Sequence, residues 1–468
     1  MGKLQPFVGL TVDGVFGRIA RMNKTMLSAM AAACAAAVFA QDPVPAQAPE
    51  AAPASDAAPV AARPRRQGPA SAQERRQALA ERRQERMQRM NAQGRTRRAS
   101  MSAGIGAEAK PFGRLSDGRE AKIWRLRGTG GLTLDVTDYG GRLVRAYAPD
   151  RYGNMADVTI GFNSAEEYEK YGMSMGTLIG RYGNRIKDGK FSLDGKEYQL
   201  AVNETNPPPR HSNIHGGPMG WDKKIWKVRP FRTGPISGLE LECDSEDGDM
   251  GFPGNMKCKV RYKVFPDNRW RVEYEATTDR PTVLNLTHHS YWNLAGEASG
   301  SVLGQELQIF ADRFTKTDDQ LIPVSHEPVK GTGFDFTELR RIDAQADWMK
   351  AQDWLKCTGN WYDHNFVLRG RAGEMKQAVL MKDPVSGRTM EIWTTEPCIQ
   401  MYGAQNASEA LPAKTPGRTL CKCCGVALET QHAPDSPNHE PSDDWPSTIL
   451  RPGEVFRSTT EYRFGISK

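Results

Sequence analysis

The stretch MKCKVRYKVFPDNRWRVEYEAT, residues 256–277, decides the fold class. Apolar residues alternate with charged ones on both sides of a Pro-Asp-Asn turn at 266–268. A period of two on each side of a turn predicts an antiparallel hairpin with one buried face and one solvated face. Cys258 falls in the apolar series, so we interpret it as a structural residue of that buried face.

The rest of the chain beyond Gly106 has the same texture, with short β-type runs separated by turn pairs. A second hairpin is predicted around Asp194-Gly195, a pair that favours tight turns. Helical signals are few: Ser164 and Glu167 can cap one short helix, and 342–355 is a second candidate. Without a βαβ rhythm, we predict an all-β fold for residues 106–468, a large antiparallel β-sandwich with few short helices.

The N-terminal region has a different character. Arg21 and Lys24 precede an uncharged, Ala-rich run at 26–40, which is short for a membrane span and fits a secretory signal cleaved after Ala40. We therefore expect residues 1–40 to be a signal region and the mature protein to be periplasmic or secreted, without stable membrane insertion. Lipidation at Cys34 is the minor alternative. Residues 41–105, rich in Ala, Pro and Arg, are expected to be a disordered tether with a possible short helix at 71–90.

Charge and cysteine content exclude some classes of function. The first hundred residues hold 16 Lys and Arg against 7 Asp and Glu, whereas the whole chain carries a net charge of +7. The remainder is therefore slightly acidic and offers no general case for binding nucleic acid. Cys421, Cys423 and Cys424 lack a second pair at zinc-ribbon spacing, so we interpret them as a chance cluster on a strand and expect no metal.

Candidate chemistry gathers at a few polar insertions in strand-like runs. His288 and His289 are either hydrogen-bonded core residues or groups that move protons near neutral pH. His211 and His215 have the spacing of a zinc-binding helix, but three prolines and two glycines around them indicate a loop, and the glycines suggest close approach of a ligand. Glu429 alone reads more readily as a satisfied strand carboxylate. Together these sites have the composition of a sugar-binding cleft.

Six segments in order resemble the aldose 1-epimerase (galactose mutarotase) family over residues 111–464. They are GRYGNRI at 180–186, HGG at 215–217, NLTHHSY at 285–291, DHNF at 363–366, TEP at 395–397 and LETQ at 428–431 followed by Pro434-Asp435-Ser436-Pro437-Asn438. The resemblance implies the family's β-supersandwich, a free aldohexose such as galactose or glucose as substrate, and neither a metal nor an organic cofactor.

The resemblance also implies roles for individual residues. Glu429 matches the general base and His289 the general acid, while the sugar-contacting positions correspond to Asn184, Arg185, His215, Asp363 and Gln400. Anomer interconversion needs a proton removed from the C1 hydroxyl and one given to the ring oxygen, so a carboxylate and an imidazole on opposite sides suffice. His288 stands where the family commonly has Asn and is expected to be structural.

Two departures near Gln400 lead us to expect a rearranged strand end: Cys398 replaces a usual Gly, and Ala404-Gln405-Asn406 replaces Thr-Gly-Asn. Three other functions stay open. An epimerase of phosphorylated hexoses would need a basic cluster that the motifs lack. A noncatalytic carbohydrate-binding or sensing protein could use the same fold, and a glycoside hydrolase could use Asp363 and Glu429 as its carboxylate pair. We expect a monomer or a weak dimer with a small-molecule aldose as its partner.

Overall fold

The computed structural model describes residues 107–205 and 210–467. The predicted signal region, tether and short helix at 71–90 lie outside these residues. Within the described part of the chain, no helix combines the length and the apolar character needed to cross a membrane.

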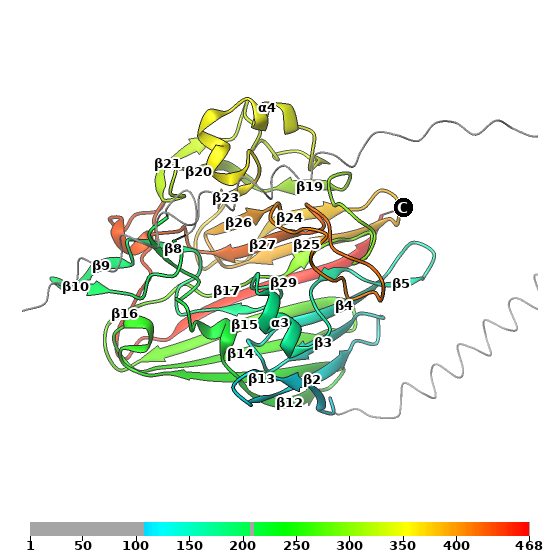
Figure 1. The fold of residues 1–468 in the computed structure, drawn as a ribbon, viewed down its shortest axis with the longest axis horizontal. Helices are drawn as coiled ribbons and strands as arrows, with labels where there is room; N and C mark the ends of the chain where they lie inside the picture. Colours follow the sequence, from blue (N-terminus) through cyan, green and yellow to red (C-terminus); the bar gives the residue numbers. More distant parts are fainter. Residues whose placement is uncertain (1–106, 206–209, 468) are drawn as a thin grey trace, which may run out of the picture. The chain divides into compact units, whose positions relative to one another are not determined.

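A nine-stranded antiparallel sheet forms around the stretch that decided the fold class. Its two central strands pair in register from Met256–Thr278 to Val264–Trp270, as the alternation predicts, and Cys258 is buried on the inner face. Figure 1 shows β13, β14 and β15 side by side. In spatial order the strands are β12 (Lys227–Thr233), β13 (Ile236–Ser245), β14 (Met256–Val264), β15 (Arg269–Thr278), β29 (Phe456–Ile466), β25 (Arg388–Thr394), β24 (Lys376–Lys382), β19 (Glu306–Ile309) and β22 (Arg340–Arg341).

A seven-stranded sheet carries most of the polar insertions. In spatial order it contains β21 (Pro323–Pro328), β20 (Ala311–Thr317), β23 (Asp363–Leu368), β26 (Cys398–Tyr402), β27 (Val426–Gln431), β18 (Tyr291–Trp292) and β6 (Thr159–Ile160). One shared apolar core joins it to the nine-stranded sheet. Trp270 of β15 stacks on Tyr462 of β29 at 4.7 Å between ring centroids, and Trp292 of β18 lies 5.1 Å from the same tyrosine.

Smaller sheets complete the fold, which is the predicted antiparallel β-sandwich. A five-stranded sheet contains β1 (Lys110–Arg114), β2 (Glu120–Arg127), β3 (Thr133–Thr137), β4 (Leu143–Pro149) and β5 (Met155–Asp157). The two-stranded ladders pair β8 (Arg185–Lys187) with β11 (Ser212–Ile214), β7 (Leu178–Ile179) with β17 (Thr287–His288), β9 (Lys190–Leu193) with β10 (Lys196–Gln199), and β16 (Thr282–Val283) with β28 (Ile449–Leu450). The β9–β10 ladder is the second predicted hairpin, with Asp194 and Gly195 both at positive φ in its turn.

The helices are short. The elements are α3 (Ala165–Tyr171), α4 (Ala346–Lys350) and the 3₁₀ turns η2 (Trp221–Lys223), η3 (Asp249–Gly251), η4 (Asp353–Thr358) and η5 (Ser436–Asn438). Ser164 caps α3 by accepting from the Glu167 backbone N–H, as predicted. The predicted helix at 342–355 is wrong as one element, because extended backbone at Gln352 separates α4 from η4.

Three local predictions also need correction. The three clustered cysteines lie on the turn before β27 and not on a strand, since that strand starts only at Val426. The loop expected at His211–His215 contains the short strand β11. Gly216 makes room for protein backbone and not for a ligand, because a Cβ there would lie 2.1 Å from the Gly180 carbonyl oxygen.

Candidate active site

The polar face of the seven-stranded sheet is where the predicted residues meet. Gln400 of β26 pairs directly with Glu429 of β27, and on its other side with Asn365 of β23. Directly paired residues point to the same face of an antiparallel sheet, and their chain neighbours to the other. The neighbours Met401 and Leu428 accordingly join the apolar core. Strand alternation thus holds the polar residues rigidly on one surface while their neighbours anchor it.

Glu429 and His289 form a buried pair on this surface. Both side chains are almost fully enclosed, and Glu429 Oε1 lies 3.5 Å from His289 Nε2. Glu429 Oε2 and His289 Nδ1 have no hydrogen-bond partner among the described residues. A buried carboxylate oxygen without a partner costs free energy, so this atom is available for a bound hydroxyl group.

Burial shifts both members of the pair toward their neutral forms. It raises the pKa of Glu429 well above its ordinary value, and Asp363 raises it further, while Arg185 opposes the shift. Burial also lowers the pKa of His289 to about 4. The shifts therefore favour a protonated carboxyl at Glu429 beside an unprotonated imidazole at His289, and the form with one base and one acid arises when that proton moves to His289.

Backbone bonds and aromatic packing fix the position of His289. Its N–H donates to the Thr177 carbonyl, and its own carbonyl accepts from the Gly176 N–H, both at 2.8 Å. Its ring stacks on that of Tyr291, with centroids 5.0 Å apart. The imidazole is thus held rigidly next to Glu429.

His288 points the other way, into the core between the sheets. Its Nδ1 lies 3.0 Å from the Ser290 hydroxyl, and its ring packs edge-on against Trp270 at 5.0 Å. Burial lowers its pKa to about 3, so it stays neutral there. The structure therefore gives His288 a packing role and separates it from the pair.

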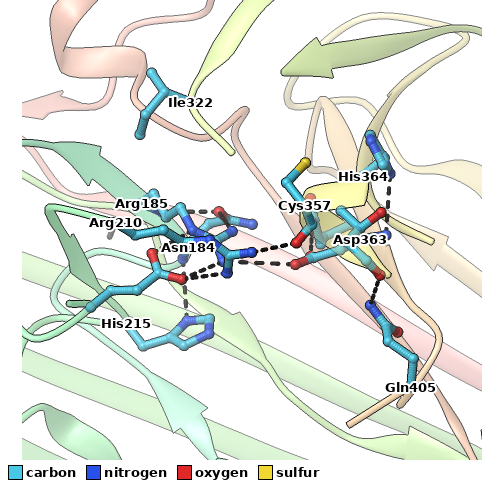
Figure 2. Close-up of polar contacts among 12 residues, drawn as sticks. Asn184, Arg185, Arg210, His215, Ile322, Cys357, Asp363, His364 and Gln405 are labelled. Atoms are coloured by element: carbon cyan, nitrogen blue, oxygen red, sulfur yellow. Dashed lines mark hydrogen bonds and ion pairs between the residues drawn. The ribbon is translucent and has the colours of Figure 1, made fainter. Parts of the chain in front are cut away.

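Arg185 is held by acidic side chains from two other segments, and Figure 2 shows it facing Asp363 and beside Arg210. Its Nε and Nη2 donate to the two oxygens of Glu204 at 2.7 and 2.8 Å. Its Nη2 also lies 3.7 Å from Asp363 Oδ2. Glu204 has a second basic partner, because Arg210 Nη1 lies 2.9 Å from Glu204 Oε1. Burial would lower the pKa of Arg185, but Asp363 and Glu204 hold it above the ordinary value, so a fixed positive charge faces the site.

Glu204 and Arg210 were missed by the sequence analysis. They lie on either side of the prolines at 207–209, where composition indicates only a loop. Their importance comes from contacts across the fold: Glu204 binds Arg185, and Arg210 donates to the Cys357 carbonyl at 2.6 Å. No local pattern in the sequence could have revealed those contacts.

Asn184 and His215 form the wall next to Arg185. Both have left-handed backbone, with φ of 61° and 52°. The Asn184 N–H donates to His215 Nδ1 at 3.3 Å, so the neutral imidazole carries its proton on Nε2. The His215 ring meets that of His289 edge-on at 5.2 Å, and burial lowers the pKa of His215 well below its ordinary value. His215 therefore offers a neutral N–H donor to the site.

Asp363 and Gln400 form the opposite wall. The Gln400 amide donates to Asp363 Oδ1 at 2.7 Å, while the buried Gln400 Oε1 has no partner in the part of the chain that the structure describes. The strand that carries Gln400 keeps regular register with both neighbours from Cys398 to Tyr402. The departures at 404–406 lie beyond this strand, where Ala404 has left-handed backbone with φ of 50°, so the expected rearrangement there stays a prediction.

Asn285 ties the walls of the site together. Its side chain accepts from the His432 N–H at 2.9 Å and donates to the carbonyls of His432 and Gly183. It is fully buried. One amide thus connects the strand of Glu429, the loop of Asn184 and the segment that leads to His289.

The arrangement suits a neutral, polyhydroxylated ligand. It combines acceptors, a neutral imidazole donor and a guanidinium around an unpaired carboxylate oxygen, and such sets bind hydroxyl groups. Within the described residues, no group of three or more His, Cys, Asp or Glu side chains is placed to hold a metal ion.

Comparison with known proteins gives one consistent family. A family model described as aldose 1-epimerase matches residues 122–463. The chain is 34% identical to an aldose 1-epimerase of Escherichia coli K12 over 354 residues, covering 74% of this chain and 96% of that protein. It is 35% identical to a human galactose mutarotase over 337 residues, covering 72% and 92%.

Solved structures agree with this result. The structure of an aldose epimerase homologue from C. elegans aligns with a TM-score of 0.64 at 28% identity, covering 74% of this chain and all of that one. A galactose 1-epimerase from Lactobacillus acidophilus gives the same TM-score at 24% identity, covering 77% and 99%, and supports the fold.

Proposed function

Because the chain belongs to the aldose 1-epimerase family, we propose that it interconverts the α and β anomers of free aldohexoses such as galactose or glucose, with Glu429 and His289 as its proton-transfer pair. The observation that carries the proposal is the enclosed pair itself, with Glu429 Oε1 3.5 Å from His289 Nε2. Relatives named for galactose and for aldoses support the substrate class.

The proposed reaction opens and closes the sugar ring. In the form of the pair whose proton lies on His289, Glu429 removes the proton of the C1 hydroxyl while His289 gives its proton to the ring oxygen, so the C1–ring oxygen bond breaks and an aldehyde forms. Rotation about C1–C2 presents the other face of the aldehyde, and the reverse transfers close the ring. Each proton transfer contributes about 10²- to 10⁴-fold to the rate.

Glu429 Oε1 and His289 Nε2 lie 3.5 Å apart. This short separation is compatible with the reaction, because the hydroxyl and ring oxygens are bonded to the same carbon. In the proposal, Arg185, His215, Asn184, Asp363 and Gln400 hold the other hydroxyl groups through hydrogen bonds.

Mutarotation kinetics on fresh α-galactose, followed by polarimetry, test the proposed function. We expect residues 41–468 to accelerate anomerisation and residues 106–468 to do so equally well. Sugar binding without acceleration would instead identify a noncatalytic carbohydrate-binding protein. Release of monosaccharide from a methyl galactoside would indicate a glycoside hydrolase.

We also propose that the protein is exported, on the support of the apolar run at 26–40 and the small residues Val38 and Ala40. Expression in a Gram-negative host should yield periplasmic protein whose mass corresponds to a start at Gln41. Cytoplasmic protein with an intact N-terminus would contradict export, and lipid attached to Cys34 would replace cleavage after Ala40.

A further inference from the structure

A row of polar side chains crosses the seven-stranded sheet at the level of Glu429. Glu429 of β27 pairs with Gln400 of β26, and Gln400 pairs with Asn365 of β23. β20 continues the row with Thr315, which is bonded to Asn365 and lies opposite His326 of β21. These five strands are neighbours in the sheet (Figure 1), so the row leads from the candidate active site to the edge strand β21.

The side chain of Asn365 is only 1% exposed, and one end of its amide is unused. Its Nδ2 donates to Thr315 Oγ1 at 2.9 Å, whereas its Oδ1 has no hydrogen-bond partner among the described residues. Gln400 Oε1 and Glu429 Oε2, the next acceptors along the row, are also buried and lack a partner in the same part of the chain. Adjacent strands lie about 4.8 Å apart. Three neighbouring acceptors therefore need donors, and buried acceptors without donors cost free energy unless a ligand or water supplies them.

Thr315 and His326 determine which end of the Asn365 amide is free. His326 Nε2 lies 3.3 Å from the Asp444 carbonyl oxygen, which can only accept, so this nitrogen carries the ring proton. Burial lowers the pKa of His326, which keeps the imidazole neutral and leaves Nδ1 as an acceptor. The Thr315 hydroxyl, 3.0 Å from Nδ1, therefore donates its single proton to His326. Thr315 can then only accept from Asn365, so the NH₂ end of the amide is held there and the carbonyl end stays free.

The outer end of the row is held in place by a ring stack and an ion pair. The Trp445 ring lies between those of His326 and His439, with centroids 4.4 and 3.7 Å apart. Arg313 donates to both carboxylate oxygens of Asp444 at 2.6 Å. These contacts fix the His326 ring and the carbonyl to which it is bonded. The Asn365 amide is thus oriented before any ligand binds, which lowers the entropic cost of a hydrogen bond to it.

We propose that Asn365 is a further specificity-determining residue, whose Oδ1 accepts a hydrogen bond from one ring hydroxyl of the bound aldose, with Thr315 and His326 as its positioning residues. This inference rests on the proposed function. An amide oxygen accepts from a hydroxyl group without adding a charge beside Glu429. A site built to bond a hydroxyl discriminates against the analogue that lacks it, because the acceptor is then left unpaired. Asn365 therefore selects for the hydroxyl at one position of the sugar ring.

The test measures kcat and KM by polarimetry for galactose and for its 2-, 3-, 4- and 6-deoxy derivatives. Asn365→Leu removes the acceptor, Thr315→Val removes the group that orients it, and Thr315→Ser keeps that hydroxyl. Thr460→Val is the matched control. The Thr460 hydroxyl is also buried and also has two side-chain partners, Thr394 and Thr430, but Thr460 lies in β29 of the nine-stranded sheet. Thermal unfolding of the mature chain and of each variant checks that all are folded.

We expect Asn365→Leu to lower kcat/KM for galactose by about three- to tenfold, the effect of one hydrogen bond, and mainly through KM. The loss should disappear for the one deoxy sugar that lacks the bonded hydroxyl, which identifies that hydroxyl. Thr315→Val should show the same pattern across the sugars. Thr315→Ser and Thr460→Val should behave like the wild type.

The contact is refuted if Asn365→Leu leaves kcat/KM for galactose unchanged. It is equally refuted if the variant lowers kcat/KM by the same factor for galactose and all four deoxy sugars, because a purely structural role has that effect. If Asn365→Leu does not fold, Thr315→Val decides by the same two criteria. Inactivity of the wild type on galactose would overturn the proposed function instead, and the same ratios of Kd, measured by calorimetry, would then decide the contact.

Discussion

Replacing Glu429 with Gln separates the catalytic from the structural consequences of burying a carboxyl group. The amide keeps the size of the side chain but cannot accept the C1 hydroxyl proton. We expect kcat to fall by about 10²- to 10⁴-fold, equivalent to about 3–5 kcal/mol of transition-state stabilisation. KM should change little, because the five residues proposed to contact the sugar are retained.

The same substitution should stabilise the fold at neutral pH. Burial raises the pKa of Glu429 above that of the unfolded chain, so the folded state binds its proton more tightly. The Glu429 proton stabilises the folded state below the pKa that Glu429 has in the unfolded chain. This stabilisation is lost as the pH rises through the higher pKa that Glu429 has in the folded protein. Because Gln carries no proton to lose, the melting temperature of Glu429→Gln should exceed that of the wild type by a margin that grows over this pH window.

Glu461 provides the matched control. It is equally buried, and burial alone would raise its pKa, but bonds from Arg463 and Arg271 at 2.7 Å hold the pKa below its ordinary value. This stabilisation is present above the unfolded pKa and disappears as the pH falls through the folded pKa. Glu461→Gln should therefore lower the melting temperature at neutral pH and keep the epimerase rate.

Polarimetry on α-galactose and thermal unfolding between pH 4 and 9 measure both effects. The reasoning is refuted if Glu429→Gln retains more than about a tenth of the wild-type kcat. It is also refuted if, relative to the wild type, the melting temperature of Glu429→Gln falls with rising pH while that of Glu461→Gln rises.

Three further predictions concern the neighbouring residues. His289→Asn should lower kcat by about 10²- to 10⁴-fold. It should also remove the acid limb near pH 4 of the wild-type rate profile, because that limb reflects the lowered pKa of His289. If the limb is unchanged in the variant, another group causes it. Asp363→Asn removes a charge that raises the pKa of Glu429. The alkaline limb of the rate profile, where the pair loses its proton, should therefore move to lower pH, and KM for galactose should rise. A limb displaced to higher pH would contradict this electrostatic reasoning. His288→Ala should cost about 2–4 kcal/mol in urea unfolding with kcat of the folded protein retained, and a selective loss of kcat would return His288 to the reaction.

The sandwich was predictable because its hairpins are encoded locally. The alternation at 256–277 specifies both the pairing and the buried face, and the structure reproduces it residue by residue. The segment 342–355 was harder, since its apolar residues fit a helix equally well until the backbone at Gln352 turns extended. Local sequence patterns therefore predicted the β-strands more reliably than the short helices.

The site was predictable in kind but not in geometry. Consecutive residues of extended chain point to opposite faces, so only one of His288 and His289 could face the ligand, and the alternation does not say which. Pairing of Gln400 with Glu429 depends on the register of two strands that are distant in sequence. The roles of Glu204 and Asn285 depend on such long-range contacts too, so the sequence analysis assigned neither of them a role, although Asn285 begins the matched segment at 285–291.

Exchange NMR on the anomeric protons of galactose tests the central claim most directly, because it observes ring opening at equilibrium. With a catalytic amount of the mature protein, cross-peaks between the α and β H1 signals should appear, and Glu429→Gln should abolish them. Methyl β-galactoside, whose C1 oxygen carries no proton, should compete for the site and remain intact. Binding of galactose without any increase in α–β exchange would contradict the account.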